Sequence, residues 1–123
     1  LTTWSNVSAN NLNGYAVKTD GTLWAWGDNG NGQIGNNTVT VYSSPVQIGT
    51  LTNWYSVFAN AANGATAIKT DGTLWGWGSN SYYQIGDGTS IDRSSPVQIG
   101  ALSNWITVGY MPNPSNGAIL SQG

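Results

Sequence analysis

Five aspartates are the only carboxylate side chains in this sequence and its candidates for catalytic acids or bases. The 123 residues contain no His and no Cys, and every acidic residue is Asp. This composition excludes disulfides, imidazole and thiolate ligands, and any nucleophile–base pair that needs His or Cys. Asp20 and Asp71 each precede a glycine, where a short carboxylate stabilises a turn, and Asp28, Asp87 and Asp92 fall in predicted loops. The sequence therefore predicts a non-enzymatic chain without a cofactor.

One short segment, DNGNGQIG at 28–35, could hold calcium, because Asp and Asn alternate with Gly there. It lacks the acidic residue that closes an EF-hand loop. The matching segment later in the chain, SNSYYQIG at 79–86, has lost the carboxylate. A turn is the favoured interpretation over calcium binding, and we predict no metal site.

The charge balance limits the class of partner. The formal net charge is −2 and only 7% of residues are charged. Three cations, Lys18, Lys69 and Arg93, are too few and too dispersed for a basic patch, so we expect no binding to nucleic acid. No apolar run reaches the length of a membrane span, so we expect no membrane insertion. The absence of Cys is compatible with an extracellular or virion-surface location, which is the location that we predict.

A long internal repeat organises these residues. KTDGTLWAWG at 18–27 returns as KTDGTLWGWG at 69–78, and SSPVQIG at 43–49 returns at 94–100. A period of this size with short strand-like segments indicates a propeller or solenoid, in which neighbouring repeats bury each other's faces. We divide the chain into propeller blade 1 at 1–50, propeller blade 2 at 51–101 and a partial third blade at 102–123.

Each full repeat is predicted to form four short strands. Asp-Gly at 20–21 and at 71–72 predicts a two-residue hairpin with a primed turn, which needs positive φ at both positions. Pro45 and Pro96 suit an edge strand, since proline cannot donate to a β-ladder. The fold class is therefore all-β, built from two four-stranded β-propeller blades and a partial third, with no helix longer than one turn. The predicted strands are Trp4–Ala9, Tyr15–Thr19, Thr22–Trp26, Pro45–Ile48, Trp54–Ala59, Thr66–Thr70, Thr73–Trp77, Pro96–Ile99, Trp105–Tyr110 and Ala118–Ser121.

The third strand of each repeat predicts how blades pack. Alternation along a strand places Trp24 and Trp26 on one face and small residues on the other. We expect the Trp pair of one blade to lie over the small-residue face of the next, with Gly27 and Gly78 facing the adjacent blade. Truncating Trp24 or Trp75 to Ala should then cost about 3–5 kcal/mol if the ring is buried. A flat sheet with exposed Trp is the disfavoured alternative, because it would create a large apolar patch.

The motifs DGTLWAWGDNGNGQIG at 20–35 and DGTLWGWGSNSYYQIG at 71–86 resemble the regulator of chromosome condensation repeat. The Trp-rich DGTLW and the SSPVQIG segment resemble the bacterial and bacteriophage branch of that family. The resemblance covers nearly the whole chain and implies a propeller, commonly seven-bladed, with four strands per blade. It does not carry over the founder's nucleosome binding or nucleotide exchange, because no exchange-loop motif and no basic surface are present. A bacterial inhibitor of beta-lactamases in this family implies that the fold can serve as a binding platform.

Positions at which the repeats differ are the candidates for ligand contact, since shared positions specify the scaffold. Tyr supplies rigid amphipathic area and Asn adaptable hydrogen bonds, and both suit protein or sugar ligands. The alternative is that Tyr82 and Tyr83 merely cover a blade edge. The candidate ligand-binding residues are Asn31, Tyr42, Asn80, Tyr82, Tyr83 and Arg93.

The leading hypothesis is a structural and adhesive binding module in a bacterial or bacteriophage surface assembly. One alternative is a glycan-binding propeller lectin, and another is a protein–protein interaction or inhibitor propeller. The two end faces should be as apolar as internal ones, because the repeats are so alike, and exposing them would promote aggregation. We therefore expect partners to be other propeller blades, by self-association or within a larger assembly, with a surface glycan or protein as further candidates.

Overall fold

The computed structural model describes residues 3–60, 63–109 and 119–122 and shows an all-β fold, which confirms the predicted fold class. The first four-stranded antiparallel sheet has the order β1-β2-β3-β4 and is called blade 1 below. Its strands are β1 (Trp4–Ala9), β2 (Asn13–Lys18), β3 (Leu23–Gly27) and β4 (Tyr42–Gln47). None of the described residues forms a helix of the length and apolarity that a membrane span requires.

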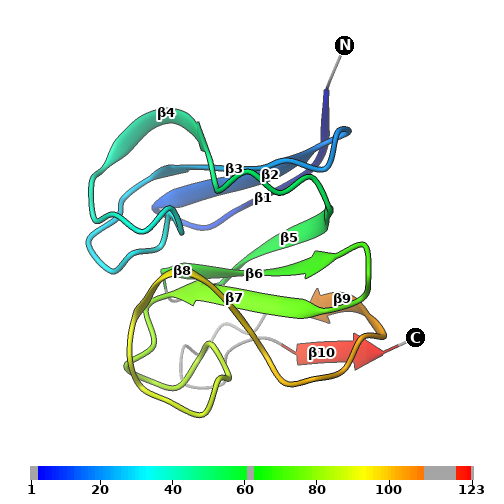
Figure 1. The fold of residues 1–123 in the computed structure, drawn as a ribbon. Coiled ribbons are helices and arrows are strands. Elements are labelled where there is room, and N and C mark those ends of the chain that lie inside the picture. Colours follow the sequence, from blue (N-terminus) through cyan, green and yellow to red (C-terminus); the bar gives the residue numbers. More distant parts are fainter. Residues whose placement is uncertain (1–2, 61–62, 110–118, 123) are drawn as a thin grey trace.

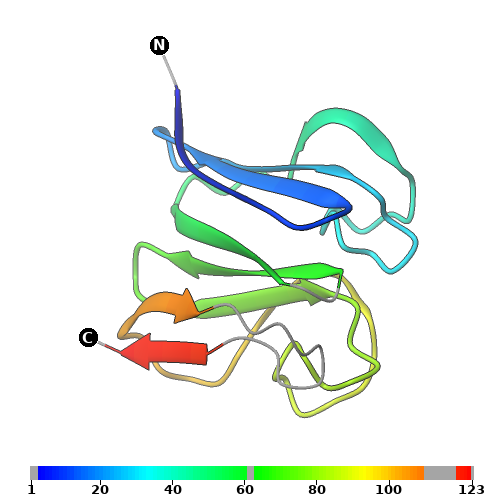
Figure 2. The same cartoon turned by 180° about the vertical axis from the view of Figure 1, so that it is seen from behind.

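The second four-stranded sheet, called blade 2 below, has the order β5-β6-β7-β8 and lies beside blade 1 (Figure 1). Its strands are β5 (Trp54–Asn60), β6 (Gly64–Lys69), β7 (Leu74–Gly78) and β8 (Arg93–Gln98). A two-stranded hairpin of β9 (Trp105–Gly109) and β10 (Ile119–Gln122) covers the other side of blade 2, as Figure 2 shows from behind. Tyr110 and Ala118, the outer ends predicted for these two strands, lie outside the described residues.

The fourth strand of each blade begins earlier than predicted and ends one residue sooner. Tyr42 pairs with Gly27 and Arg93 pairs with Gly78, because the pairing register shifts between Ala25 and Gly27 and between Gly76 and Gly78. Pro45 and Pro96 do lie on these edge strands, as predicted. Each strand begins with polar residues, Tyr-Ser-Ser or Arg-Ser-Ser. A prediction based on apolar residues therefore placed the start of the strand too late.

The Asp-Gly turns differ from the predicted primed turns. Only the glycine of each pair has positive φ, 83° at both Gly21 and Gly72. The Gly21 N–H donates to the Lys18 carbonyl at 2.9 Å and the Lys18 N–H donates to the Thr22 carbonyl at 3.0 Å. This is a three-residue loop in which a type I turn is followed by a left-handed glycine. The prediction of a two-residue turn was wrong because Thr19 is part of the loop.

Asp20 and Asp71 stabilise these turns, as predicted. Oδ1 of Asp20 accepts hydrogen bonds from the backbone N–H of Thr22 at 3.1 Å and from its hydroxyl at 2.6 Å. The Thr22 hydroxyl in turn accepts from Trp24 Nε1 at 2.8 Å. Asp71, Thr73 and Trp75 repeat the arrangement in blade 2. The DGTLW motif thus fixes the orientation of the first Trp of each pair.

The main core lies between the two blades and contains a Trp of the predicted pair. Trp77 of blade 2 is fully buried against blade 1, where its ring meets Tyr15 at a centroid distance of 6.1 Å. Its Nε1 donates to the Gln33 carbonyl at 3.0 Å. Gly35 leaves room for this ring, since a Cβ there would strike it. The remaining buried members of this core are Val17, Leu23, Ala25, Ile34, Ile48, Trp54, Val57, Ala59, Ala65 and Ala67.

Two details of the predicted packing require correction. Trp24 and Trp75 are only partly buried, so the largest truncation cost moves to Trp77. Gly27 and Gly78 do not face the adjacent blade. Their φ values are 110° and 104°, and an added Cβ would strike backbone of the same blade. Backbone conformation therefore explains both glycines.

Candidate functional site

The long loops at 28–41 and 79–92 lie on the same side of the two blades and carry most of the predicted ligand residues (Figure 1). One buried asparagine organises each loop. Asn80 Nδ2 donates to the Thr89 and Ile91 carbonyls at 2.8 and 3.0 Å, and its Oδ1 accepts from the Ile85 N–H at 3.0 Å. Asn29 makes the same set of contacts in blade 1. Asn80 is fully buried, so it supports the loop and has no access to a ligand.

The loop of blade 1 docks onto blade 2. The Asn37 N–H donates to the Ser94 carbonyl at 2.6 Å, and Asn31 Nδ2 donates to Asp92 Oδ2 at 3.2 Å. Gly32 fits against Ser94 so closely that a Cβ would collide with it. The predicted ligand residue Asn31 is therefore engaged at the junction between blades. This loop tip therefore packs against the neighbouring blade of the same chain.

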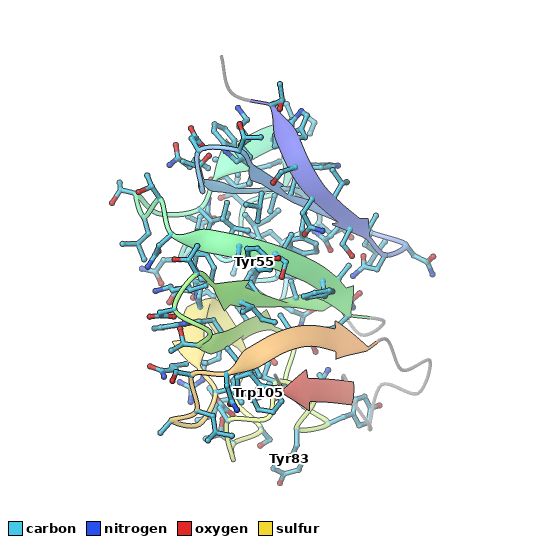
Figure 3. The ribbon with its side chains drawn as sticks, turned by 90° about the vertical axis from the view of Figure 1, so that its right-hand side faces the viewer. Tyr55, Tyr83 and Trp105 are labelled. Carbon is cyan, nitrogen blue, oxygen red and sulfur yellow. The ribbon has the colours of Figure 1, made fainter. Side chains whose placement is uncertain are left out.

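The matching tip of blade 2 carries Tyr82 and Tyr83 in place of Asn31 and Gly32. These rings are 57% and 65% exposed. Figure 3 shows Tyr83 at the end of its loop, pointing away from the sheets. Tyr83 has φ of 59°, a left-handed conformation that is rare for a bulky residue. Strain of this kind concentrates at functional positions, and it marks this tip as the candidate site.

Two other predicted ligand residues have structural contacts. Arg93 Nε donates to Asp87 Oδ2 at 2.9 Å in an ion pair, and its Nη2 lies 3.3 Å from the Thr89 hydroxyl. Asp87 also accepts from Asn80 Nδ2, so Asn80 and Arg93 converge on one carboxylate. Tyr42 begins β4, is half-buried and packs against the core between the blades. Of the predicted set, only Tyr82 and Tyr83 are both exposed and outside these networks.

The stability of this loop depends on pH through the Asp87 carboxyl group. Burial raises the pKa of Asp87, but the hydrogen bonds from Thr89, Arg93 and Asn80 outweigh burial and hold it below its usual range. The folded chain therefore binds this proton more weakly than the unfolded chain does. Its contribution to stability is complete above the unfolded pKa of about 3.9 and is lost as pH falls through the folded pKa.

We expect acid to destabilise the wild type more steeply than Asp87→Asn below about pH 4, because the variant has no proton to take up at this site. Urea denaturation followed by circular dichroism from pH 7 down to about pH 2.5 measures the slope. Equal slopes for the two proteins would contradict the assignment.

A second recurring group, which was not predicted from the sequence, places a lysine ammonium over two Trp rings. Lys69 Nζ lies 3.9 Å from the Trp75 ring centroid and 5.0 Å from that of Trp54. Lys18 is stacked in the same way in blade 1, against Trp24 and Trp4. The KTDGTLW motif carried a signal, because Lys69 and Trp75 lie diagonally across β6 and β7, where Trp75 pairs with Ala67, two residues before the lysine. The ring from the first strand is remote in sequence and could not be placed.

These observations define a class: repeated propeller blades that expose an aromatic loop tip. Two family models described as "Regulator of chromosome condensation (RCC1) repeat" match the chain. One covers residues 20–63 and 71–110, and the other covers residues 4–33 and 56–84. The chain belongs to the RCC1 repeat family, as its motifs indicated.

Several known proteins are similar to this chain. It is 32% identical over 85 residues to the Ultraviolet-B receptor UVR8 of Arabidopsis thaliana, covering 68% of this chain and 19% of the relative. It is 34% identical over 85 residues to mouse Protein RCC2, covering 68% of this chain and 16% of that protein. It is 30% identical over 122 residues to the human protein named "Probable E3 ubiquitin-protein ligase HERC6", covering 94% of this chain and 12% of that protein. The chain therefore spans less than a fifth of these relatives.

Solved structures share the fold. Human WBSCR16 superposes with a TM-score of 0.79 at 17% identity, covering 98% of this chain and 32% of that one. Prp20p of Saccharomyces cerevisiae, described with its binding to Gsp1p and histones, gives a TM-score of 0.76 at 20% identity, covering 89% and 29%. At these identities the likeness shows the fold alone.

Proposed function

We propose that this chain is a non-enzymatic protein-binding module that uses the loop tip at Tyr82 and Tyr83. One observation carries the proposal: the equivalent tip in blade 1 packs against the next blade of the chain, through Asn31 and Gly32. In blade 2 the tip presents two exposed rings, one of them in a strained backbone conformation. Exposed Tyr is enriched where protein surfaces meet, because it buries a large area at low entropic cost.

The chemistry of the described residues favours binding over catalysis. Within them, no group of three or more His, Cys, Asp or Glu side chains comes together. The carboxylates of Asp20, Asp71 and Asp87 are engaged in their own turns or in the ion pair with Arg93. The ligase activity in the name of one relative belongs to a protein of which this chain matches 12%, and we do not propose it here.

A further blade of the same kind is the partner that we favour, including one from a second copy. The open side of blade 1 presents Trp4 and Val7 at 45% and 60% exposure. The matching residues of blade 2, Trp54 and Val57, are 4% and 0% exposed because blade 1 covers them. Covering the open side would remove a similar apolar area from water. Head-to-tail packing of copies would supply that cover.

The setting that we propose is the surface of a bacterium or bacteriophage, outside the cell, with an adhesive role. Its support is the Trp-rich form of the motifs, the low charge and the absence of Cys. The relatives described above come from plant, human and mouse, so this setting rests on the sequence features. Immunogold labelling of cells or particles from the source, with antibody raised against the chain, tests the location.

We expect the double variant Tyr82→Asn/Tyr83→Gly to weaken self-association or partner binding by tenfold or more, since a central Tyr anchor is worth about 2 kcal/mol. The variant restores the residues found in blade 1, and Tyr83→Gly also relieves the left-handed strain. The folded chain should therefore gain roughly 0.5–1 kcal/mol of stability. Light scattering across a concentration series measures the association, and thermal melting measures the stability.

Tyr55→Ser is the matched control, because it also replaces an exposed Tyr by the residue of blade 1, and it leaves the loop intact. A stable monomer of 12.9 kDa at all concentrations, with no protein partner retained by the wild type alone, would contradict the proposal. Binding on a glycan array that the double variant loses would favour the lectin hypothesis instead.

A further inference from the structure

A cavity of about 340 Å³ opens between the two blades, on the β4 and β8 edge of the junction. Blade 1 and its linker contribute Ile48 and Leu51, and blade 2 contributes Trp54, Trp75 and Pro96, so the walls are mostly apolar. Lys69 lines the same cavity. The volume falls at the lower end of the range for small-molecule sites.

Lys69 is unusual because it is buried without an anion in direct contact with its ammonium group. The residue is only 9% exposed, and its Nζ lies over the rings of Trp75 and Trp54. Among the described residues, the one ion pair joins Arg93 to Asp87, and no hydrogen bond from Lys69 Nζ is present. The Asp71 carboxylate accepts its hydrogen bonds from Thr73 and interacts with the Lys69 charge only at longer range, which helps to lower the pKa of Asp71. A buried ammonium ordinarily has a charged partner, since desolvation is costly.

We infer that this cavity binds a small organic anion, a carboxylate carried on a flat apolar body. The carboxylate would pair with Lys69 Nζ, where low solvent access strengthens the charge interaction. The flat body would lie against Trp54, Trp75 and Pro96 and displace water from their apolar surfaces. The inference concerns a small ligand and is independent of the protein-binding tip at Tyr82 and Tyr83.

Blade 1 supplies an internal comparison. Lys18 has the same two Trp neighbours, at 4.1 and 4.8 Å, and the same Asp-Gly turn. Lys18 lines a different pocket, together with Asp20, Thr52 and Tyr55. Contact with two Trp rings is therefore common to both lysines, whereas the apolar cavity at the blade junction is lined by Lys69 and not by Lys18.

The test is a calorimetric titration of the full chain with phenylacetate, and with the neutral phenylacetamide as ligand control. We expect phenylacetate to bind with a Kd of roughly 0.1–1 mM, as suits a ligand of this size, and phenylacetamide at least tenfold more weakly. Lys69→Met keeps an unbranched side chain between the rings and should weaken phenylacetate binding at least tenfold. Lys18→Met should leave the affinity unchanged.

A second pair of variants keeps the inference testable if Lys69→Met unfolds the chain. Ser95→Trp narrows the cavity mouth without touching the lysine, whereas Ser44→Trp makes the same change on blade 1. We expect only Ser95→Trp to abolish binding. No binding by the wild type at roughly tenfold above the expected Kd, or equal loss in both Ser variants, would overturn the inference. Tyr82→Asn/Tyr83→Gly should bind phenylacetate normally, which separates this site from the proposed function.

Discussion

Replacing Trp77 by Ala should destabilise the chain more than any other single truncation on its strands, by about 3–5 kcal/mol. The ring is fully buried between the blades and contacts Tyr15. Its Nε1 donates one of two buried hydrogen bonds to the Gln33 carbonyl, and the variant keeps only the one from the Tyr15 hydroxyl. The cavity cannot collapse easily, because β-sheets on both sides hold its walls. Urea denaturation followed by circular dichroism measures the loss.

Trp26→Ala is the matched control, since Trp26 occupies the same strand position in blade 1. That ring is partly exposed, and it faces the open side of blade 1, where its aromatic neighbour is Trp4. Its truncation should cost about half as much or less, because less area returns to water. Equal losses for the two variants would mean that packing between blades does not hold Trp77, and the description of the core would be wrong.

The fold followed from the sequence because three local signals agreed. The repeat set the unit, the Asp-Gly pairs marked the turns, and alternation in Leu23–Gly27 placed alternate residues on opposite faces. The buried face of β3, with Leu23 and Ala25, lies toward blade 2 as the pattern required. The details of local backbone geometry were not predicted correctly. Gly27 lies close to the backbone of Leu12 and Asn13 in its own blade, and β4 begins early, at Tyr42. Both features accompany an irregularity in the β3–β4 pairing that cannot be predicted from residue types.

The candidate site was harder to predict, because exposure and partners are properties of the folded chain. Asn80 and Asn29 are identical in the two repeats, and that identity was the available signal for a scaffold role. Tyr82 and Tyr83 differ from their counterparts, and they are the exposed pair. The Lys69 cavity could not be predicted, since its walls come from two blades and its second ring lies on a different strand.

Asn80→Ala should also be severe, with an expected loss of about 2–3 kcal/mol, although the residue lies in a loop. The amide of Asn80 is fully buried and bonds to Ile85, Thr89, Ile91 and Asp87. Removing it leaves several of these groups without a partner, and each unsatisfied buried group costs about 1–3 kcal/mol. Relaxation of the loop into water should recover part of that cost. Thermal and urea denaturation measure the loss.

The matched control for Asn80→Ala is Ser81→Ala, one residue further along the same loop, where the side chain is exposed and the stability should change by less than about 0.5 kcal/mol. The comparison separates a scaffold role from a ligand role. If Asn80 has a scaffold role, Asn80→Ala should lower the melting temperature whether or not a partner is present. The tip at Tyr82 and Tyr83 should then lose its binding only because the loop is destabilised. If Asn80→Ala melted like the wild type yet lost a partner, Asn80 would contact that partner directly. The loop would then have to open on binding, because the closed loop buries this amide completely.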